Sequence, residues 1–236
     1  MNGKQVPPDF RVVRAAAPVR QSVTESIRNS IALGYFTAGQ RITERDLCEM
    51  TGVSRTAVRE ALRQLESEGL VDVVPHRGPT VARLTAEQAE GVYQVRIELE
   101  GLACELFARN ATDQDIADLK ASHEVLKGLE AMQDPLERLT AKNAFYETLI
   151  RGTHNEALGR TLSALNARVM VLRAMSLAVP GRTRASLLEL QALIDLLEAR
   201  KGKEARKLAA KHVMNAGKVA LQMLSQQLHE ADQPEE

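Results

Sequence analysis

The 236-residue sequence predicts a mainly α-helical protein with two domains. Alanine and leucine are abundant, aromatic residues make up only 3% and tryptophan is absent, a composition that favours helices. Helix start signals recur along the chain, whereas only two short segments, both before residue 84, have the pattern of strands. We therefore expect a small N-terminal domain that contains the strands, followed by an all-helical bundle.

Residues 18–84 have the order helix, helix, turn, helix and hairpin. The expected elements are a helix over 19–33, a helix from Thr43 to Gly52, a helix from Ser54 to Gly69, and strands over 70–74 and 80–82. Thr43 and Ser54 can accept hydrogen bonds from backbone N–H groups at the helix starts. Val19, Val23, Ile27 and Ile31, spaced by four, are the expected buried positions of the first helix. This order predicts a winged helix-turn-helix, with Phe36 in its core and the wing tip at 75–79.

The helix that follows Ser54 has two distinct faces. Apolar residues at helical spacing predict a packed face made of Val58, Ala61, Leu62 and Leu65. Arg55, Arg59 and Arg63 lie four apart on the neighbouring face. A surface helix with solvated arginines is the plain alternative. The turn before this helix and the hairpin after it instead favour a helix whose N-terminus enters the major groove of DNA.

Residues 18–84 resemble the DNA-binding domain of the GntR superfamily of bacterial transcription regulators. The matching segments are Ile42-Thr43-Glu44-Arg45-Asp46-Leu47, the run from Gly52 to Leu62, Leu65-Glu66 and Gly69-Leu70-Val71. The rest of the chain resembles the all-helical effector domain of the FadR-like branch, the FCD type. The resemblance implies DNA contacts by Arg45, Ser54, Arg55, Thr56 and Arg59, and by the wing tip at His76, Arg77 and Gly78.

The charge balance places limits on how this chain would meet DNA. The net charge is zero, with twelve Lys or Arg against nine Asp or Glu in 1–84 and nineteen against twenty-two in 85–236. Phosphate contacts must therefore depend on placement rather than on bulk charge. We expect a flexible arm over 1–17 and a disordered acidic tail over 232–236. Cys48 and Cys104 are expected to be reduced and buried, and we expect a cytoplasmic protein because neither a signal region nor a membrane span is visible.

The second domain is predicted as an antiparallel bundle of about six helices over 85–231. The expected helices run from Thr85 to about Asn110, Thr112 to about Gln133, Asp134 to before Asn155, Asn155 to about Val179, Thr183 to about Gly202, and Lys203 to His229. Thr85 with Gln88 forms a capping box, and Asp134 precedes a proline at the first helical position. Short connections between helices of this length imply antiparallel neighbours.

Several polar residues lie on the apolar faces of these helices. The expected stripes are Val92, Val95, Leu99, Ala103 and Leu106 in the first helix, Leu136, Leu139 and Ile150 in the third, and Leu208 and Val219 in the sixth. The polar residues within them are Arg96, Asn143, Tyr146, His212 and Asn215. Either Arg96 pairs with Glu100 and the others bond within the bundle, or the five line a cavity for a small organic anion.

The resemblance also raises the question of a metal, because many such effector domains hold a divalent ion with one Asp and three His. The corresponding positions here are Lys142, Tyr146, Leu190 and His212, of which only His212 keeps its ligand. One imidazole, even with Asn143 beside it, cannot make a normal transition-metal site. We therefore expect neither a metal nor another cofactor.

The sequence predicts a homodimeric, ligand-responsive transcription regulator, and we expect a repressor that binds a pseudo-palindromic site on double-stranded DNA. One alternative is an enzyme that acts on a small acid, with Tyr146 and His212 in acid–base roles and the DNA-binding domain as an appendage. No nucleophile–base pair or phosphate loop supports that alternative. A second alternative is a DNA-binding protein whose cavity is filled by its own side chains.

Overall fold

A computed structural model describes residues 16–128 and 134–231. The predicted acidic tail and most of the predicted arm lie outside these residues. Ala16 and Ala17, assigned to the arm from the sequence, instead belong to the first helix. Within the described residues the chain forms nine helices and one two-stranded sheet, so the prediction of a mainly helical fold is confirmed.

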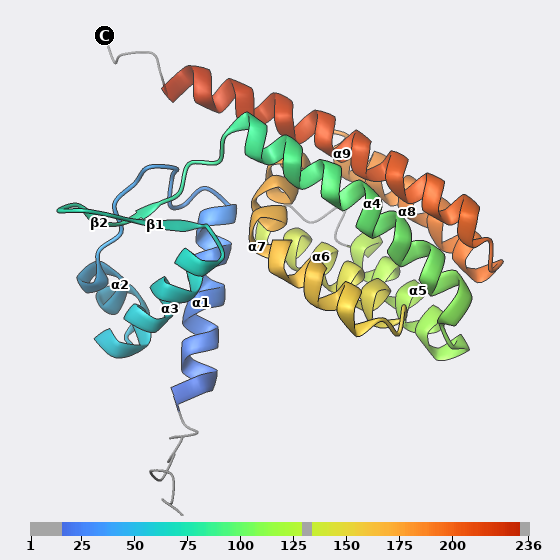
Figure 1. Cartoon of the computed structure of the whole chain (residues 1–236), viewed down its shortest axis with the longest axis horizontal. Coiled ribbons are helices and arrows are strands. Elements are labelled where there is room, and N and C mark those ends of the chain that lie inside the picture. Colours follow the sequence, from blue (N-terminus) through green and yellow to red (C-terminus); the bar gives the residue numbers. More distant parts are fainter. Residues whose placement is uncertain (1–15, 129–133, 232–236) are drawn as a thin grey trace, which may run out of the picture.

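The N-terminal domain, called the head below, holds three helices and the sheet (Figure 1). Its elements are α1 (Ala16–Ala32), α2 (Glu44–Thr51), α3 (Arg55–Ser67), β1 (Val71–Val74) and β2 (Gly78–Val81). The strands are antiparallel, in a register that runs from Val71 opposite Val81 to Val74 opposite Gly78. β2 begins two residues earlier than the sequence predicted, because Gly78 and Pro79 pair with β1 and leave only three residues in the turn.

The helix-turn-helix is built from the predicted caps. The Thr43 side chain accepts a hydrogen bond from the Asp46 N–H at 3.1 Å, and Ser54 accepts one from the Ala57 N–H at 3.3 Å. Between the two helices, Gly52 has φ 69°, a left-handed conformation that favours glycine. This glycine allows α3 to follow α2 after a turn of three residues.

The core of the head lies between α1, α2 and α3 and under the sheet. Ile27, Leu47, Val58 and Leu65 are at most 2% exposed. Val19 was predicted to be buried and is not, since 44% of its surface is exposed. Residues spaced by four are offset by about 40° around the helix axis at each step, so a series of them does not stay on one face. Val19 lies one turn before Val23, the first member of the series that is buried in this core.

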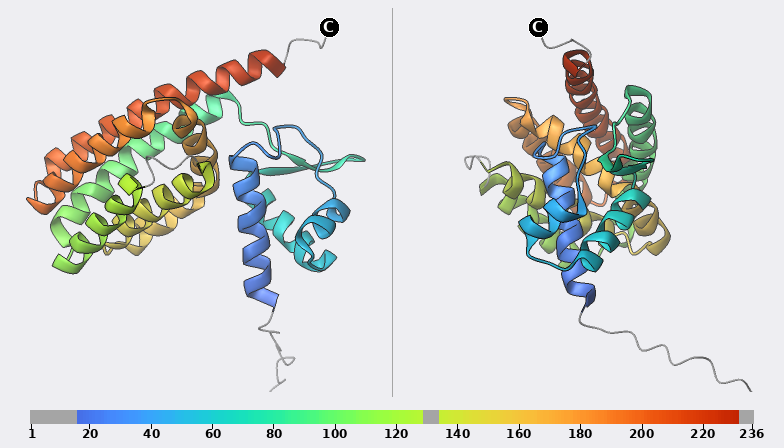
Figure 2. Two further views of the ribbon diagram at one scale, coloured as in Figure 1. Left: turned by 180° about the vertical axis from the view of Figure 1, so that it is seen from behind. Right: turned by 90° about the vertical axis from the view of Figure 1, so that its left-hand side faces the viewer.

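The C-terminal domain is a bundle of six helices, confirming the predicted architecture. They are α4 (Ala86–Asn110), α5 (Asp113–Gly128), α6 (Pro135–Arg151), α7 (Glu156–Ala178), α8 (Arg182–Glu198) and α9 (Gly202–Ala231). The long helices α4 and α9 lie side by side along the whole bundle (Figures 1 and 2). The predicted capping box of Thr85 and Gln88 is present, and Asp134 caps α6.

Two helix ends differ from the prediction. The described part of α5 ends at Gly128, and residues 129–133 lie outside the described residues. α8 ends at Glu198 rather than near Gly202, because Arg200 takes a left-handed conformation with φ 57°. The N–H groups of Arg200 and Lys201 then bond back to the carbonyls of Leu197 and Leu196, which closes the helix.

The apolar stripes were placed slightly off centre. Val95 and Leu136, both expected in the core, are 45% and 38% exposed. In α4 the buried face follows Tyr93, Arg96 and Glu100, two of which carry a charge. A hydrophobic pattern cannot locate a face whose centre is ionic. Cys104 is a buried free thiol as predicted, whereas Cys48 is also free but only partly buried.

α7 is the bundle helix that packs against the head, through α1 (Figure 1). Ala167 belongs to the core of the head, and Met170 packs with Ala32 at the end of α1 and with Leu139 of α6. The Arg168 side chain lies over Gly69, directly after α3. Among the described helices, none alone is long and apolar enough to cross a membrane, although the bent pair α7 and α8 passes that test together.

Candidate functional site

The α3 face expected to meet DNA is open to solvent. α2 and α3 lie on the side of α1 that faces away from the bundle (Figure 2). Arg55, Thr56 and Arg59 are exposed, whereas Val58 and Ala61 are completely buried. The helix therefore packs through one side and presents its arginines on the other, as the sequence predicted.

The Ser54 hydroxyl caps α3 through its oxygen, and its hydrogen stays free to donate. Its hydroxyl oxygen accepts the bond from Ala57 N–H, which satisfies a backbone donor at the start of α3. The hydroxyl hydrogen can still donate to a phosphate oxygen. With the exposed N-terminal N–H groups of α3, this makes the helix start suitable for a phosphate.

Arg59 is held by a carboxylate of the neighbouring helix. Its Nε and Nη2 donate to the two oxygens of Glu44 at 2.8 and 2.9 Å. The hydrogen bond and charge of Arg59 lower the pKa of Glu44. Arg45, 75% exposed at its side chain, lies 3.6 Å from Glu49. Arg45 and Arg59 must therefore leave a carboxylate before either can contact DNA.

The wing tip lies at the end of the hairpin, with His76 and Arg77 exposed. His76 and Gly78 both have positive φ, at 63° and 80°. The Arg77 guanidinium donates to the Gly39 carbonyl at 3.4 Å, which links the tip to the loop after α1. The predicted tip residues thus form one exposed basic corner of the head.

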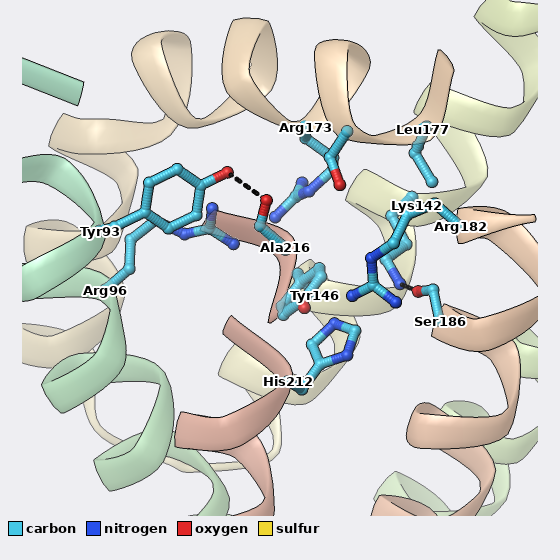
Figure 3. A pocket seen from close by; sticks show the side chains of 11 residues that line it. Tyr93, Arg96, Lys142, Tyr146, Arg173, Leu177, Arg182, Ser186, His212 and Ala216 are labelled. Carbon is cyan, nitrogen blue, oxygen red and sulfur yellow. Dashed lines mark hydrogen bonds between the residues drawn. The ribbon is translucent and has the colours of Figure 1, made fainter. Parts of the chain in front are cut away.

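A second polar site lies inside the bundle (Figure 3). The cavity has a volume of about 20 Å³ and is lined by side chains from α4, α6, α7, α8 and α9. The lining residues are Tyr93, Arg96, Lys142, Tyr146, Arg173, Ser176, Leu177, Arg182, Ser186, His212 and Ala216. Below, this set is called the bundle pocket.

Three of the five residues expected in a cavity, Arg96, Tyr146 and His212, line the bundle pocket. The other two lie just behind its wall. Asn143 accepts a hydrogen bond from Arg173, and Asn215 donates to Glu189 at 2.7 Å. The structure thus brings together the polar residues of three helices, with the two asparagines in supporting positions.

Sequence reasoning missed the contributions of α7 and α8. Arg173, Arg182 and Ser186 were not singled out, although each is at least 93% buried. A signal was present for Arg173, which follows the buried residues Val169 and Met170 at helical spacing. Arg182 begins its helix beside a glycine, where no periodic pattern exists to mark it as buried.

Arg96 has the internal partner that the sequence left open. Its Nε donates to Glu100 at 2.7 Å, and both side chains are less than 8% exposed. Burial is the largest influence on each group and opposes its charge. The partner's charge, their hydrogen bond and neighbouring groups together outweigh it, so the pKa of Arg96 is raised and that of Glu100 is lowered. The Arg96 guanidinium also lies 4.9 Å from the centre of the Tyr93 ring.

Glu189 joins α8 to α9 beside the bundle pocket. One oxygen contacts His212 Nδ1 at 2.5 Å and Arg182 Nη2 at 2.9 Å, and the other accepts from Asn215. Burial alone would raise the pKa of Glu189, but these donors lower it to about 2. Burial lowers the pKa of His212 to about 4, so at neutral pH an uncharged His212 donates to an ionised Glu189.

Two cations of the bundle pocket bond only to neutral groups within the described residues. Lys142 Nζ donates to the Ser186 hydroxyl at 2.5 Å, and Arg173 donates to the Asn143 side-chain oxygen. Both side chains are buried, at 5% and 7% exposed. Burial and neighbouring arginines lower the pKa of each, and the charge of Glu100, joined for Lys142 by that of Glu189, opposes this only in part. Both groups also lie over the Tyr146 ring, at 5.7 and 4.3 Å from its centre.

The residues at the expected metal positions do not fit a divalent ion. Lys142, Tyr146 and His212 do meet in the bundle pocket, and Leu190 is fully buried in the apolar core. Buried arginines and a lysine would repel a metal cation, and the pocket holds one imidazole. Within residues 16–128 and 134–231 no group of three His, Cys, Asp or Glu could hold a metal. The absence of a metal remains a prediction.

Comparisons with known proteins agree on both parts of the chain. Residues 19–81 match the model for bacterial regulatory proteins of the gntR family, and residues 91–215 match the FCD domain. The HTH-type transcriptional regulator YdhC of Bacillus subtilis is 30% identical over 200 residues, covering 84% of this chain and 88% of YdhC. The gluconate operon transcriptional repressor of Bacillus licheniformis is 29% identical, over 63% of this chain and 60% of that protein.

The solved structure of Escherichia coli McbR/YncC has the same fold. Its TM-score is 0.75 at 24% identity, and the match covers 89% of this chain and 98% of the other. The family models together account for the helix-turn-helix face and for the bundle that holds the pocket. This chain belongs to the GntR family of bacterial transcription regulators, with an FCD domain as its helical part.

Proposed function

We propose that this GntR-family regulator is a repressor that releases its operator when a small organic anion binds in the bundle pocket. The observation that carries this proposal is the pair Arg173 and Lys142, two buried cations without a carboxylate partner among the described residues. Burying a charge is costly unless an opposite charge compensates it. A carboxylate ligand supplies that charge, and a guanidinium can hold it with two parallel hydrogen bonds.

The head supplies the DNA contacts of the proposal. Arg55 and Arg59 read base edges or phosphates in the major groove, Ser54 and Thr56 bind phosphates, and Arg45 and the wing tip contact the backbone. The proposed active form is a homodimer joined through the FCD domains. Its two heads bind the halves of a pseudo-palindrome, as two-fold symmetry requires.

The proposed response passes through α7, which contacts both sites. Met170 and Ala167 pack against the head. Arg173 lines the bundle pocket about one turn after Met170, and Ser176 lines it about one turn after Arg173. An anion that draws Arg173 toward itself shifts α7 against α1. A coupling free energy of about 1–3 kcal/mol would weaken DNA binding five- to more than a hundredfold.

The repressor role is supported by the similarity to the gluconate operon repressor, whose name refers to a carboxylate. The enzyme alternative has weaker support. Burial raises the pKa of Tyr146 and lowers that of His212. The pair that was considered for acid–base work therefore consists of a neutral phenol and a neutral imidazole, both enclosed by cations.

The test begins with DNA that copurifies with the protein from its host, because the bound sequence identifies the operator. Labelled operator is then titrated with carboxylic acids in the presence of wild-type protein or Arg173→Met. We expect acids to release DNA from the wild type and not from the variant, with its melting temperature recorded as a check of folding. Wild-type protein that holds its operator at every acid concentration contradicts the proposal, and consumption of an acid during the assay supports the enzyme alternative.

A further inference from the structure

The charges of the bundle pocket do not balance. Four buried cations, Lys142, Arg96, Arg173 and Arg182, line it. Two carboxylates of the described residues bond to its lining, Glu100 to Arg96 and Glu189 to Arg182. Counted in their charged forms, the four cations exceed the two carboxylates by two positive charges. The excess is assigned to Lys142 and Arg173 because each of these bonds to a neutral oxygen instead.

The two unmatched cations come from different walls. Lys142 is on α6 and Arg173 is on α7, and each is held by one hydrogen bond, to Ser186 and to Asn143 respectively. Both approach the same aromatic ring, that of Tyr146, within 5.7 Å of its centre. One short molecule can therefore contact both Lys142 and Arg173. It would need a separate anionic group for each, because the two side chains reach the ring from different positions (Figure 3).

The two carboxylates beside the pocket, Glu100 and Glu189, are already bonded to other residues. Glu100 is already bonded to Arg96, and Glu189 is bonded to three donors. Moving either one to Lys142 or Arg173 would leave another buried group without its partner, at a similar cost. Among the described residues these two carboxylates act on the pair only at a distance, so a bound anion is the partner that would match it directly.

We infer that the bundle pocket takes a short dicarboxylate, with one carboxylate on Arg173 and the other on Lys142. The inference rests on the proposed function and specifies its effector class. Arg173 has the planar fork that binds a carboxylate through two N–H groups, whereas the Lys142 ammonium binds the other end as a point charge. The ring of Tyr146 lies along the carbon chain between them. The two cations lie 5.7 and 4.3 Å from the centre of that ring, so a dicarboxylate with a chain of about three to five carbons can reach both once the walls have moved apart to admit it.

The test compares acids that differ in one carboxylate. Full-length protein is titrated by calorimetry with malonate, succinate and glutarate, and with propionate, butyrate and valerate, which match them in carbon number. Inorganic phosphate is included as a compact dianion. A charge-assisted hydrogen bond supplies enough free energy that at least one dicarboxylate should bind roughly tenfold to a hundredfold tighter than its matched monocarboxylate.

Two lysine variants assign this preference to a residue. Lys142→Met keeps a similar volume without the charge, and it should bind the dicarboxylate and its matched monocarboxylate with nearly equal affinity. Lys211→Met makes the same change at the exposed position next to His212 and should keep the wild-type preference. Removing a buried charge that has no carboxylate partner is not expected to unfold the protein, and the melting temperature checks this.

The outcomes separate this inference from the proposed function. If the wild type binds dicarboxylates and monocarboxylates equally well, the dicarboxylate inference is wrong, whereas the proposed anion site is retained. Tighter binding of phosphate than of every dicarboxylate also overturns it, in favour of one compact dianion. A dicarboxylate preference that survives in Lys142→Met removes Lys142 from the site. Binding of no acid at all overturns both proposals together.

Discussion

At the scale of single residues, His212 determines part of the pH dependence of stability. Its pKa is lowered to about 4 by burial, below the ordinary value of 6.5. The unfolded chain therefore binds a proton at a higher pH than the folded one does, so stability falls as the pH drops from 6.5 toward 4. The loss from this residue is roughly 2–3 kcal/mol. We expect the melting temperature to decrease over that interval.

The variant His212→Gln tests this, because glutamine can still donate to Glu189 but does not titrate. His123 is also buried with a lowered pKa, so the difference between variant and wild type is the measured quantity. The variant should lose less stability between pH 6.5 and 4. Glu189, with its pKa lowered to about 2, contributes in a separate window below pH 4.5. Parallel curves for the two proteins above pH 4.5 would show that His212 is not the titrating group.

Arg96 was predicted from sequence as an effector contact, and its ion pair now makes a sharper prediction. Arg96→Met leaves Glu100 as a buried charge without its partner and should cost about 3–5 kcal/mol of stability. The double variant Arg96→Met with Glu100→Leu removes both charges and should be close to the wild type. Urea unfolding measures both. A single variant of normal stability that no longer responds to acid would instead favour a direct contact with the ligand.

Under the proposed function, DNA must replace the contact between Arg59 and Glu44. Arg59→Ala should weaken operator binding roughly tenfold or more if Arg59 reads a guanine, or reduce the salt slope by about one unit if it meets a phosphate. Glu44→Gln frees the arginine and removes a negative charge from the face, so binding to random DNA should become tighter. Gel shifts at several salt concentrations measure both. Glu25→Gln on α1 is the control, and an effect of equal size there would indicate bulk charge only.

At the scale of elements, α7 makes a prediction about coupling. Met170 is 3% exposed and packs with α1 and α6, whereas Met175 of the same helix packs with α4 and α9. Met170→Ala leaves a cavity at the contact with the head and should cost about 2–5 kcal/mol where packing is lost. We expect this variant to show a smaller ratio of DNA affinities without and with acid. Met175→Ala is the matched control, and equal loss of response in both would mean that α7 does not act through its contact with α1.

The element scale also shows what a sequence can predict. Helix starts were located at Thr43, Ser54, Thr85 and Asp134, because a cap is a local interaction within three residues. Buried faces were located less well, since Val95 and Leu136 were placed in the core and are exposed. The cause is the ionic centre of the buried face of α4, which depends on partners from other helices.

At the scale of the whole molecule, the pocket depends on contacts that no local pattern contains. Arg96, Tyr146 and His212 were found because each interrupts an apolar stripe on its own helix. Arg182 was missed because its burial follows from how α8 packs against α9, whereas the helical spacing of Arg173 after Val169 and Met170 was a local signal that was overlooked. The choice between Glu100 and a ligand as the partner of Arg96 was likewise open until side-chain positions were known, and the 2.7 Å contact is with Glu100.

The small volume of the bundle pocket has a consequence for the timing of the response. About 20 Å³ accommodates roughly one water molecule, so an acid can enter only after the walls move apart. The rate at which labelled operator is released should then rise with acid concentration and level off at the rate of wall opening. Leu177→Ala removes part of one wall and should raise the maximum rate of operator release in a stopped-flow experiment. Under the proposed function, a pulse of acid shorter than the time of wall opening would therefore release little operator.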